Sequence, residues 1–129
     1  MNQRTVFKVV EVVNRKMFSS SSLFLHNEFL LTYEIGKTTY PKIGRIFVFD
    51  TYEHASSFVN WKVNYSILKG IATDVGKPKF MARSVVNKYF VELFWTLKQN
   101  KKSLRSELTC STIEGTLNCS SFTPTARVW

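Results

Sequence analysis

The clearest hydrophobic pattern in the chain lies in residues 43–59, IGRIFVFDTYEHASSFV. The apolar run Ile46–Phe49 is too short for a core helix and is rich in strand-forming residues, so it predicts a buried central strand. Asp50 follows this run, with Glu53 three residues later. The D-x-x-E spacing predicts the start of a helix, because the Asp side chain can accept from free N–H groups of the first turn while the Glu reaches back to the cap. We therefore expect a strand that leads into a helix over residues 51–61.

Four other segments have the alternation or the β-branched content of strands. They are residues 5–13, residues 28–35, Tyr65–Thr73 and Phe80–Ala82. The alternation is clearest in EFLLTYEI, where every second residue from Phe29 to Ile35 is apolar or aromatic. In YSILKGIAT, a glycine inside a strand pattern predicts a bulge at Gly70.

Residues 85–99 permit two interpretations. Their apolar residues fill a helical stripe, with polar residues on the opposite side; the stripe consists of Val85, Val86, Tyr89, Phe90, Leu93, Phe94 and Leu97. The same segment also alternates as a strand, and its Val and aromatic content favours that alternative. We favour a helix, and the strand stays open.

Together these elements predict a single α+β domain over residues 1–129. We expect a mainly antiparallel sheet of about five or six strands with two helices packed on one face. In residues 108–129, Gly115 is expected to make a turn, followed by an edge strand over residues 116–122 and a flexible tail. Pro124 fits a sheet only at such an edge, because proline cannot donate to the hydrogen-bond ladder.

The composition is that of a folded protein, with 44% hydrophobic and 15% aromatic residues, whereas disordered chains are depleted in aromatic residues. The apolar runs are only a few residues long, and a bilayer crossing takes about 20 apolar residues. Residues 1–16 lack the apolar centre and the cleavage site of a signal peptide. These features predict a cytoplasmic protein without a membrane partner.

The cysteines and histidines do not indicate a metal site or a disulfide framework. Cys110 and Cys119 lie nine residues apart in a Ser/Thr-rich segment, and only His26 and His54 could join them. The glycines lack the context of a phosphate-binding motif. We expect two reduced thiols, no metal and no cofactor.

The formal net charge is +9, from 18 basic and 9 acidic residues, and such a surplus favours polyanionic partners. Residues 77–105 contain eight basic residues and a single acidic one, Glu92. A second basic stretch is the loop formed by residues 36–44, with the arginine that follows it. The residues expected to bind nucleic acid or another anion are Lys37, Lys42, Arg45, Lys79, Arg83, Lys88, Lys98, Lys101, Lys102 and Arg105.

Aromatic residues are interleaved with the cations of residues 77–105, namely Tyr89, Phe90, Phe94 and Trp95. Aromatic side chains that stack on bases contribute about 1–3 kcal/mol each. The same side chains also fit the face of a helix that packs on a core, and an exposed lysine face is common on soluble proteins. The aromatic pattern alone does not separate these two interpretations.

An enzyme is the weaker hypothesis. His54 lies four residues after Asp50, so the two side chains can meet on a helix, and a carboxylate beside a histidine is half of a general-base arrangement. The sequence specifies no nucleophile, and the simpler interpretation is an exposed histidine near a capping Asp50. A catalytic role would require a pocket around these two residues. We therefore expect no catalytic residue.

One set of residues resembles a known group of proteins. The set comprises Tyr33-x-x-Gly36, Pro41, Gly44, Phe47-Val48-Phe49, Glu53-x-Ala55-x-x-Phe58 and Gly115-Thr116. Mainly over residues 30–59, this combination is similar to small uncharacterised α+β proteins encoded by phages and large DNA viruses. The resemblance implies a viral protein of the host cytoplasm or the virion, and it brings no activity and no catalytic residue with it.

These observations predict a noncatalytic basic binding module that contacts nucleic acid or an acidic protein surface. The alternative is a virion structural protein or an inhibitor of a host system, which would act through an apolar interface near Phe90, Trp95 and Trp129 and could form a homo-oligomer. Salt-sensitive binding to nucleic acid would favour the first hypothesis. A concentration-dependent oligomer would favour the second.

Overall fold

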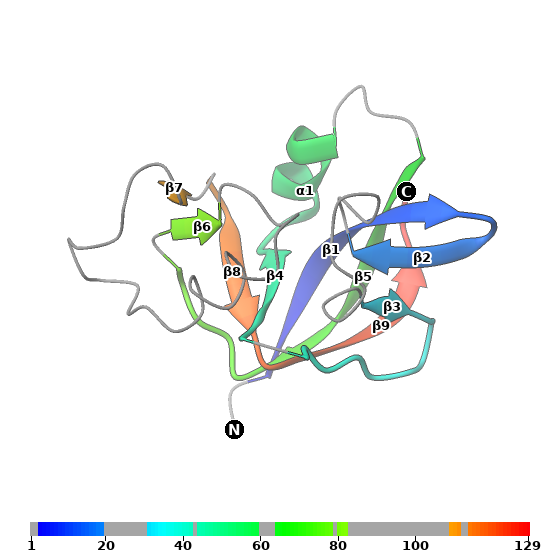
Figure 1. Ribbon diagram of the computed structural model, residues 1–129, viewed down its shortest axis with the longest axis horizontal. Coiled ribbons are helices and arrows are strands. Elements are labelled where there is room, and N and C mark those ends of the chain that lie inside the picture. Colours follow the sequence, from blue (N-terminus) through cyan, green and yellow to red (C-terminus); the bar gives the residue numbers. More distant parts are fainter. Residues whose placement is uncertain are drawn as a thin grey trace.

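The structure is a computed structural model that describes residues 3–19, 31–42, 44–59, 64–78, 80–82, 109–111 and 114–129. Its elements in chain order are β1 (Gln3–Val13), β2 (Lys16–Ser19), β3 (Thr32–Tyr33), β4 (Ile46–Phe49), α1 (Tyr52–Val59), β5 (Tyr65–Thr73), β6 (Phe80–Ala82), β7 (Thr109–Ser111), β8 (Thr116–Cys119) and β9 (Ser121–Arg127). Among the described residues, seven strands form one antiparallel sheet, and β6 pairs with β7 in a separate two-stranded sheet (Figure 1). The mainly antiparallel sheet with a packed helix is confirmed, but the expected five or six strands are too few. The second expected helix falls in residues 85–99, outside the described part of the chain.

Strand β1 organises the sheet because both of its edges are paired. Along one edge it pairs with β5 from Gln3 to Glu11. The other edge is divided between two partners: β4 pairs at Phe7, and β2 pairs from Val10 to Val13. The sheet therefore forks beside β1, with β2 and β3 on one branch and β4 and β8 on the other (Figure 1). The prediction that Ile46–Phe49 is a buried strand inside the sheet is confirmed, since β4 lies between β1 and β8.

The sheet curls until the segment after β3 meets β9. The Gly36 amide donates to the Pro124 carbonyl at 2.7 Å, and Thr39 exchanges backbone hydrogen bonds with Phe122 at 2.8 and 3.0 Å. A ring of strands, β1, β2, β3, β9 and β5, is thereby closed around a core. The buried side chains of that core are Val6, Val10, Tyr33, Ile46, Val48, Leu68, Ala72, Leu117, Cys119 and Phe122.

A second, smaller core lies on the other face of β1, under α1 (Figure 1). Ala55 and Val59 of the helix are buried there against Val9, Phe49 and Ile67. Apolar side chains recur along this helix at the i, i+3, i+4 spacing that gives one packing face. The predicted helix is thus confirmed over Tyr52–Val59, and its expected last turn, residues 60 and 61, lies outside the described residues.

The helix begins differently from the prediction, because Thr51 and not Asp50 is the cap. The Thr51 Oγ1 accepts a hydrogen bond from the His54 amide at 3.1 Å, which is the contact that an N-cap residue makes with the third helical residue. The Asp50 carboxylate is directed instead to the His54 ring, at 2.6 Å from Nδ1. The sequence interpretation placed the cap one residue too early because both residue types are good caps.

Removal of this cap is expected to destabilise the protein. Thr51→Ala should lower the free energy of unfolding by about 1 kcal/mol, because the His54 amide loses its acceptor in the first turn. Urea denaturation of the two proteins measures the difference. Thr51→Ser, which keeps the hydroxyl, is the matched control and should unfold close to the wild type; equal losses in both variants would contradict the cap assignment.

Two predictions about strands are corrected. The chain turns after β3, so Ile35 does not continue the apolar stripe and is 49% exposed. The expected single strand over residues 116–122 is two strands, since the chain bends at Ser120 between β8 and β9. The bulge at Gly70 is confirmed: the β5–β9 register shifts between Lys69 and Gly70.

Lys8 is a charged residue inside the curled sheet, close to the fork of β1. Its side-chain Nζ donates to the Phe47 carbonyl at 2.7 Å and lies 5.9 Å from the centre of the Tyr33 ring. Burial lowers the pKa of Lys8 from 10.5 to about 8, because the charged form loses its water. Burial also raises the pKa of the free thiol of Cys119 to about 11, so that thiol stays protonated at neutral pH.

Candidate basic groove

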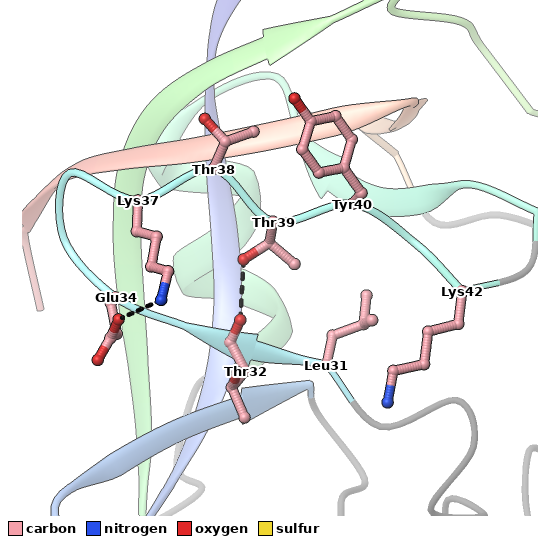
Figure 2. Close-up of a pocket in the computed structure, with 8 residues that line it drawn as sticks. All are labelled: Leu31, Thr32, Glu34, Lys37, Thr38, Thr39, Tyr40 and Lys42. Atoms are coloured by element: carbon pink, nitrogen blue, oxygen red, sulfur yellow. Dashed lines mark hydrogen bonds and ion pairs between the residues drawn. The ribbon is translucent and has the colours of Figure 1, made fainter.

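The segment from β3 to residue 42 surrounds a surface groove, which we call the loop groove (Figure 2). Its volume is about 270 Å³. Eight residues line it: Leu31, Thr32, Glu34, Lys37, Thr38, Thr39, Tyr40 and Lys42. The groove therefore contains two of the lysines that the sequence predicted as anion-binding residues.

Hydrogen bonds hold the backbone of this segment in a defined shape. The Lys37 amide donates to the Glu34 carbonyl at 3.1 Å, which closes a turn around Gly36. Gly36 has a φ of +83°, a left-handed conformation that glycine adopts at little cost. The Thr39 hydroxyl then donates to the Thr32 carbonyl at 2.8 Å, across the groove (Figure 2). The loop is thus bonded both to itself and, through Gly36 and Thr39, to β9.

Side chains leave this extended segment on two sides. Lys37, Thr39 and Lys42 point to the side on which Leu31 lies, whereas Thr38 and Tyr40 point to the opposite side (Figure 2). Successive side chains of an extended chain alternate in this way. The Tyr40 side chain is largely solvated, with 68% of the residue exposed. A ligand that crosses the segment would therefore meet two amines on one side and an aromatic ring on the other.

The charges of the groove are only weakly compensated within the protein. Lys37 Nζ lies 3.5 Å from Glu34 Oε2, but both side chains are more than two-thirds exposed, and exposed pairs of this kind contribute about 0–1 kcal/mol. Lys42 makes no ion pair with any residue of the described part of the chain. Both amines can therefore bind a phosphate group of a ligand at a small cost in free energy.

Arg45 does not join the groove. Its Nη1 lies 2.9 Å from Asp74 Oδ2, its Nε donates to Asn118 Oδ1 at 2.8 Å, and its Nη2 bonds to the Asp74 carbonyl. These contacts tie the entry to β4 to the turn after β5 and to β8. The guanidinium thus has a structural role with its charge matched by a carboxylate, which differs from its predicted part in the anion-binding surface.

The other seven predicted anion-binding residues lie outside the described residues. They are Lys79, Arg83, Lys88, Lys98, Lys101, Lys102 and Arg105. Sequence reasoning also missed Tyr40, the exposed aromatic side chain of the groove. Its position in a loop, directly before Pro41 and between two lysines, is the signal that could have identified it.

Comparison of the chain with protein-family models, with curated proteins and with solved structures gives no match. Within the described ranges, no helix combines the length and the apolar character that a bilayer crossing requires.

Proposed function

We propose that this protein binds nucleic acid, and that the loop groove is part of the binding surface. The observation that carries the proposal is a loop, held in place by hydrogen bonds, that presents an exposed Tyr40 ring on one side and the amines of Lys37 and Lys42 on the other (Figure 2). Lysines neutralise backbone phosphates and release their counterions, whereas an exposed ring can stack on an unpaired base. Both kinds of contact are present on one short segment.

A single strand is the form of nucleic acid that this surface suits. Bases in a duplex are already stacked on one another, so an isolated tyrosine has access to a base face only where the strand is unpaired. Contacts between lysines and phosphates, and between an aromatic ring and the face of a base, carry little sequence information. We therefore expect binding that depends on strand form and on salt more than on sequence.

The test is fluorescence anisotropy with a labelled single-stranded RNA at two salt concentrations. Joint Lys37→Ala and Lys42→Ala should weaken binding and make it less dependent on salt, with a slope shallower by about 0.7 for each phosphate that is no longer neutralised. Tyr40→Ala should cost about 1–3 kcal/mol of binding free energy. Lys69→Ala is the matched control, because Lys69 is an exposed lysine of β5 that does not line the groove.

Two results would contradict the proposal. One is equal binding by the wild type and the double lysine variant, which would place the contact elsewhere. The other is the absence of salt-dependent binding to any single-stranded RNA or DNA.

The alternative function is assembly through an apolar surface. The observation in its favour is the exposure of Val128 and Trp129 at the end of the chain, after β9. Phe90 and Trp95, the other residues predicted for such an interface, lie outside the described residues. Light scattering that shows a concentration-dependent oligomer, unchanged in the double lysine variant, would favour this alternative.

A further inference from the structure

A second cavity lies where β4 ends and β8 begins. Its volume is about 300 Å³, and it is lined by Asp50, His54, Lys77, Pro78, Glu114, Gly115, Thr116 and Leu117. The Asp50 amide donates to the Gly115 carbonyl at 2.9 Å, so a backbone hydrogen bond joins the residue before the helix cap to the turn before β8. A pocket around Asp50 and His54 is the condition that a catalytic role requires, and this cavity meets that condition.

The imidazole of His54 is held between two carboxylates. Its Nδ1 lies 2.6 Å from Asp50 Oδ1, one helical turn earlier. Its Nε2 lies 3.9 Å from Glu114 Oε1 on the turn before β8. The contact with Asp50 fixes the ring orientation and leaves Nε2 as the nitrogen on the side of Glu114. A histidine that is oriented by a carboxylate in this way is suited to proton transfer.

Gly115 shows that the turn is shaped around this pair of side chains. A Cβ atom at this position would lie 2.6 Å from Asp50 Oδ1 and would collide with the His54 ring. The glycine also has a φ of +86°, which residues with a side chain rarely adopt. The close approach of the turn to Asp50 and His54 therefore requires glycine, and it brings the Glu114 carboxylate beside the imidazole.

The surroundings of His54 favour its protonated form. The hydrogen bond with Asp50 is the largest cause that raises the pKa of His54 above 6.5. Burial opposes this rise, and the charges of Asp50, Glu114 and Glu53 add to it. The remaining charged group of the cavity is the amine of Lys77. The cavity thus brings together an imidazole whose protonated form is favoured, a carboxylate and an amine.

We propose that this cavity cleaves RNA by transfer of the phosphodiester to the neighbouring 2′-hydroxyl, with His54 as the general acid and Glu114 as the general base; for its substrate class this inference rests on the proposed function. Glu114 takes the proton of the 2′-hydroxyl as the bond from O2′ to phosphorus forms. The bond from phosphorus to O5′ breaks, and His54 Nε2 gives its proton to O5′. The products are a 2′,3′-cyclic phosphate and a 5′-hydroxyl.

RNA is the substrate that fits because it carries its own nucleophile. The cavity provides proton transfer and a cation, and the 2′-hydroxyl provides the attacking oxygen. Lys77 would neutralise the charge that develops on the non-bridging oxygens of the phosphate. After each turnover Glu114 holds the proton that His54 has lost, and the 3.9 Å separation of the two groups allows the proton to return. The Glu114 side chain is 89% exposed, so it can move aside to admit the phosphodiester.

A catalytic role departs from the noncatalytic expectation drawn from the sequence. That expectation rested on the absence of a nucleophile and on the view that Asp50 caps the helix. The structure assigns the cap to Thr51, which leaves the Asp50 carboxylate directed to the imidazole. The other two residues, Lys77 and Glu114, lie too far from His54 in the sequence for any spacing to predict that they meet it.

The test uses two versions of one fluorescent single-stranded oligonucleotide: an all-DNA strand with one ribonucleotide, and the same strand with a 2′-deoxynucleotide there. The full-length protein should cleave only the first, at that ribonucleotide, and leave a cyclic phosphate. His54→Gln should lower the cleavage rate at least about 100-fold, and Glu114→Gln should lower it by a similar factor. Lys69→Gln is the control for the loss of an exposed charge: Lys69 lies on β5, does not line the cavity and should leave most of the rate.

The pH dependence separates the positioning role of Asp50 from a structural one. The wild-type rate should fall at high pH as His54 loses its proton, with the midpoint above pH 6.5 because its pKa is raised. Asp50→Asn removes the first cause of that shift, so the midpoint should move to lower pH. A variant that is only destabilised would lose rate at every pH without moving the midpoint.

Four results bear on the catalytic inference and on the proposed function. If the wild type binds both oligonucleotides and cleaves neither, the catalytic inference is overturned and the proposed function stands. Cleavage that is unchanged in His54→Gln, with circular dichroism confirming the fold of this variant, would overturn it as well. If the wild type neither binds nor cleaves either oligonucleotide, both proposals are overturned. Cleavage of the ribonucleotide strand that persists after Lys37→Ala and Lys42→Ala would support this site while contradicting the loop groove.

Discussion

Gly70→Ala is expected to lower the free energy of unfolding by about 3 kcal/mol, since overpacking a well-packed core typically costs about 1–3 kcal/mol and sometimes more. A Cβ atom on Gly70 would lie 2.8 Å from two ring carbons of Phe122 and even closer to the Thr123 carbonyl oxygen. The Phe122 ring is fully buried, and Thr123 belongs to the β9 backbone. Neither can move without separating β9 from β5. Urea denaturation at neutral pH measures the loss.

Gly36→Ala is the control for this prediction. Nothing lies within 4 Å of a Cβ atom at Gly36, but its φ of +83° is unfavourable for alanine. The free energy of unfolding of this variant should fall by only about 1–2 kcal/mol, which is the cost of a left-handed backbone conformation for alanine. If Gly70→Ala were no less stable than Gly36→Ala, the close packing of β5 against β9 at the bulge would be wrong.

Lys8→Met is expected to stabilise the protein at pH 7. The lowered pKa of Lys8, from 10.5 to about 8, means that the buried charge destabilises the folded state by about 3 kcal/mol relative to a neutral amine. Methionine has a similar shape and no charge, but it leaves the Phe47 carbonyl without this donor, which costs about 1 kcal/mol. The expected net gain is about 1–2 kcal/mol in the free energy of unfolding.

The same residue predicts a pH dependence whose sign follows from proton binding. Because the folded-state pKa lies below the unfolded value of 10.5, the unfolded state binds more protons between about pH 8 and 10.5, and stability rises with pH there. The gain should be about 1 kcal/mol between pH 7 and 9. Cys119 acts in the opposite direction above pH 9, because its folded-state pKa is raised to about 11, so the measurement should end at pH 9.

Lys8→Met should lack this rise, and Lys69→Met, at an exposed position of β5, should retain it. Two results would show that the Lys8 amine is better solvated than its position indicates. One is a wild-type stability that does not change from pH 7 to 9, and the other is a Lys8→Met variant that is less stable than the wild type at pH 7.

Much of the fold could be predicted from local patterns. The strand at Ile46–Phe49, the helix after it and the bulge at Gly70 are all confirmed, because each is signalled by a pattern of residues close together in sequence. Predictions failed where tertiary contacts decide. Ile35 continues an apolar alternation, yet the turn at Gly36 directs the chain to β9 and leaves this side chain exposed. The sequence of the segment contains no sign of that partner, which lies more than eighty residues away.

The candidate sites follow the same rule: features that depend on neighbouring residues could be predicted, and contacts between distant residues could not. The basic character of the 36–44 loop was apparent from its lysines, whereas the structural role of Arg45 depends on Asp74 and Asn118, two residues that are distant in sequence. His54 and Asp50 could be paired from their helical spacing. Glu114 reaches them only because β4 and β8 are neighbours in the sheet.

The closure of the strand ring by β9 has a consequence for synthesis. Phe122, a fully buried residue of the main core, lies on β9, and so do the backbone groups that bond to Gly36 and Thr39. Strand β9 leaves the ribosome after the strands that it closes. Until residue 127 has emerged, the nascent chain presents an open sheet edge on β5 and an unfilled interior. Such an edge is a template for pairing with another polypeptide, so the newly made chain is more prone to aggregation than the finished protein.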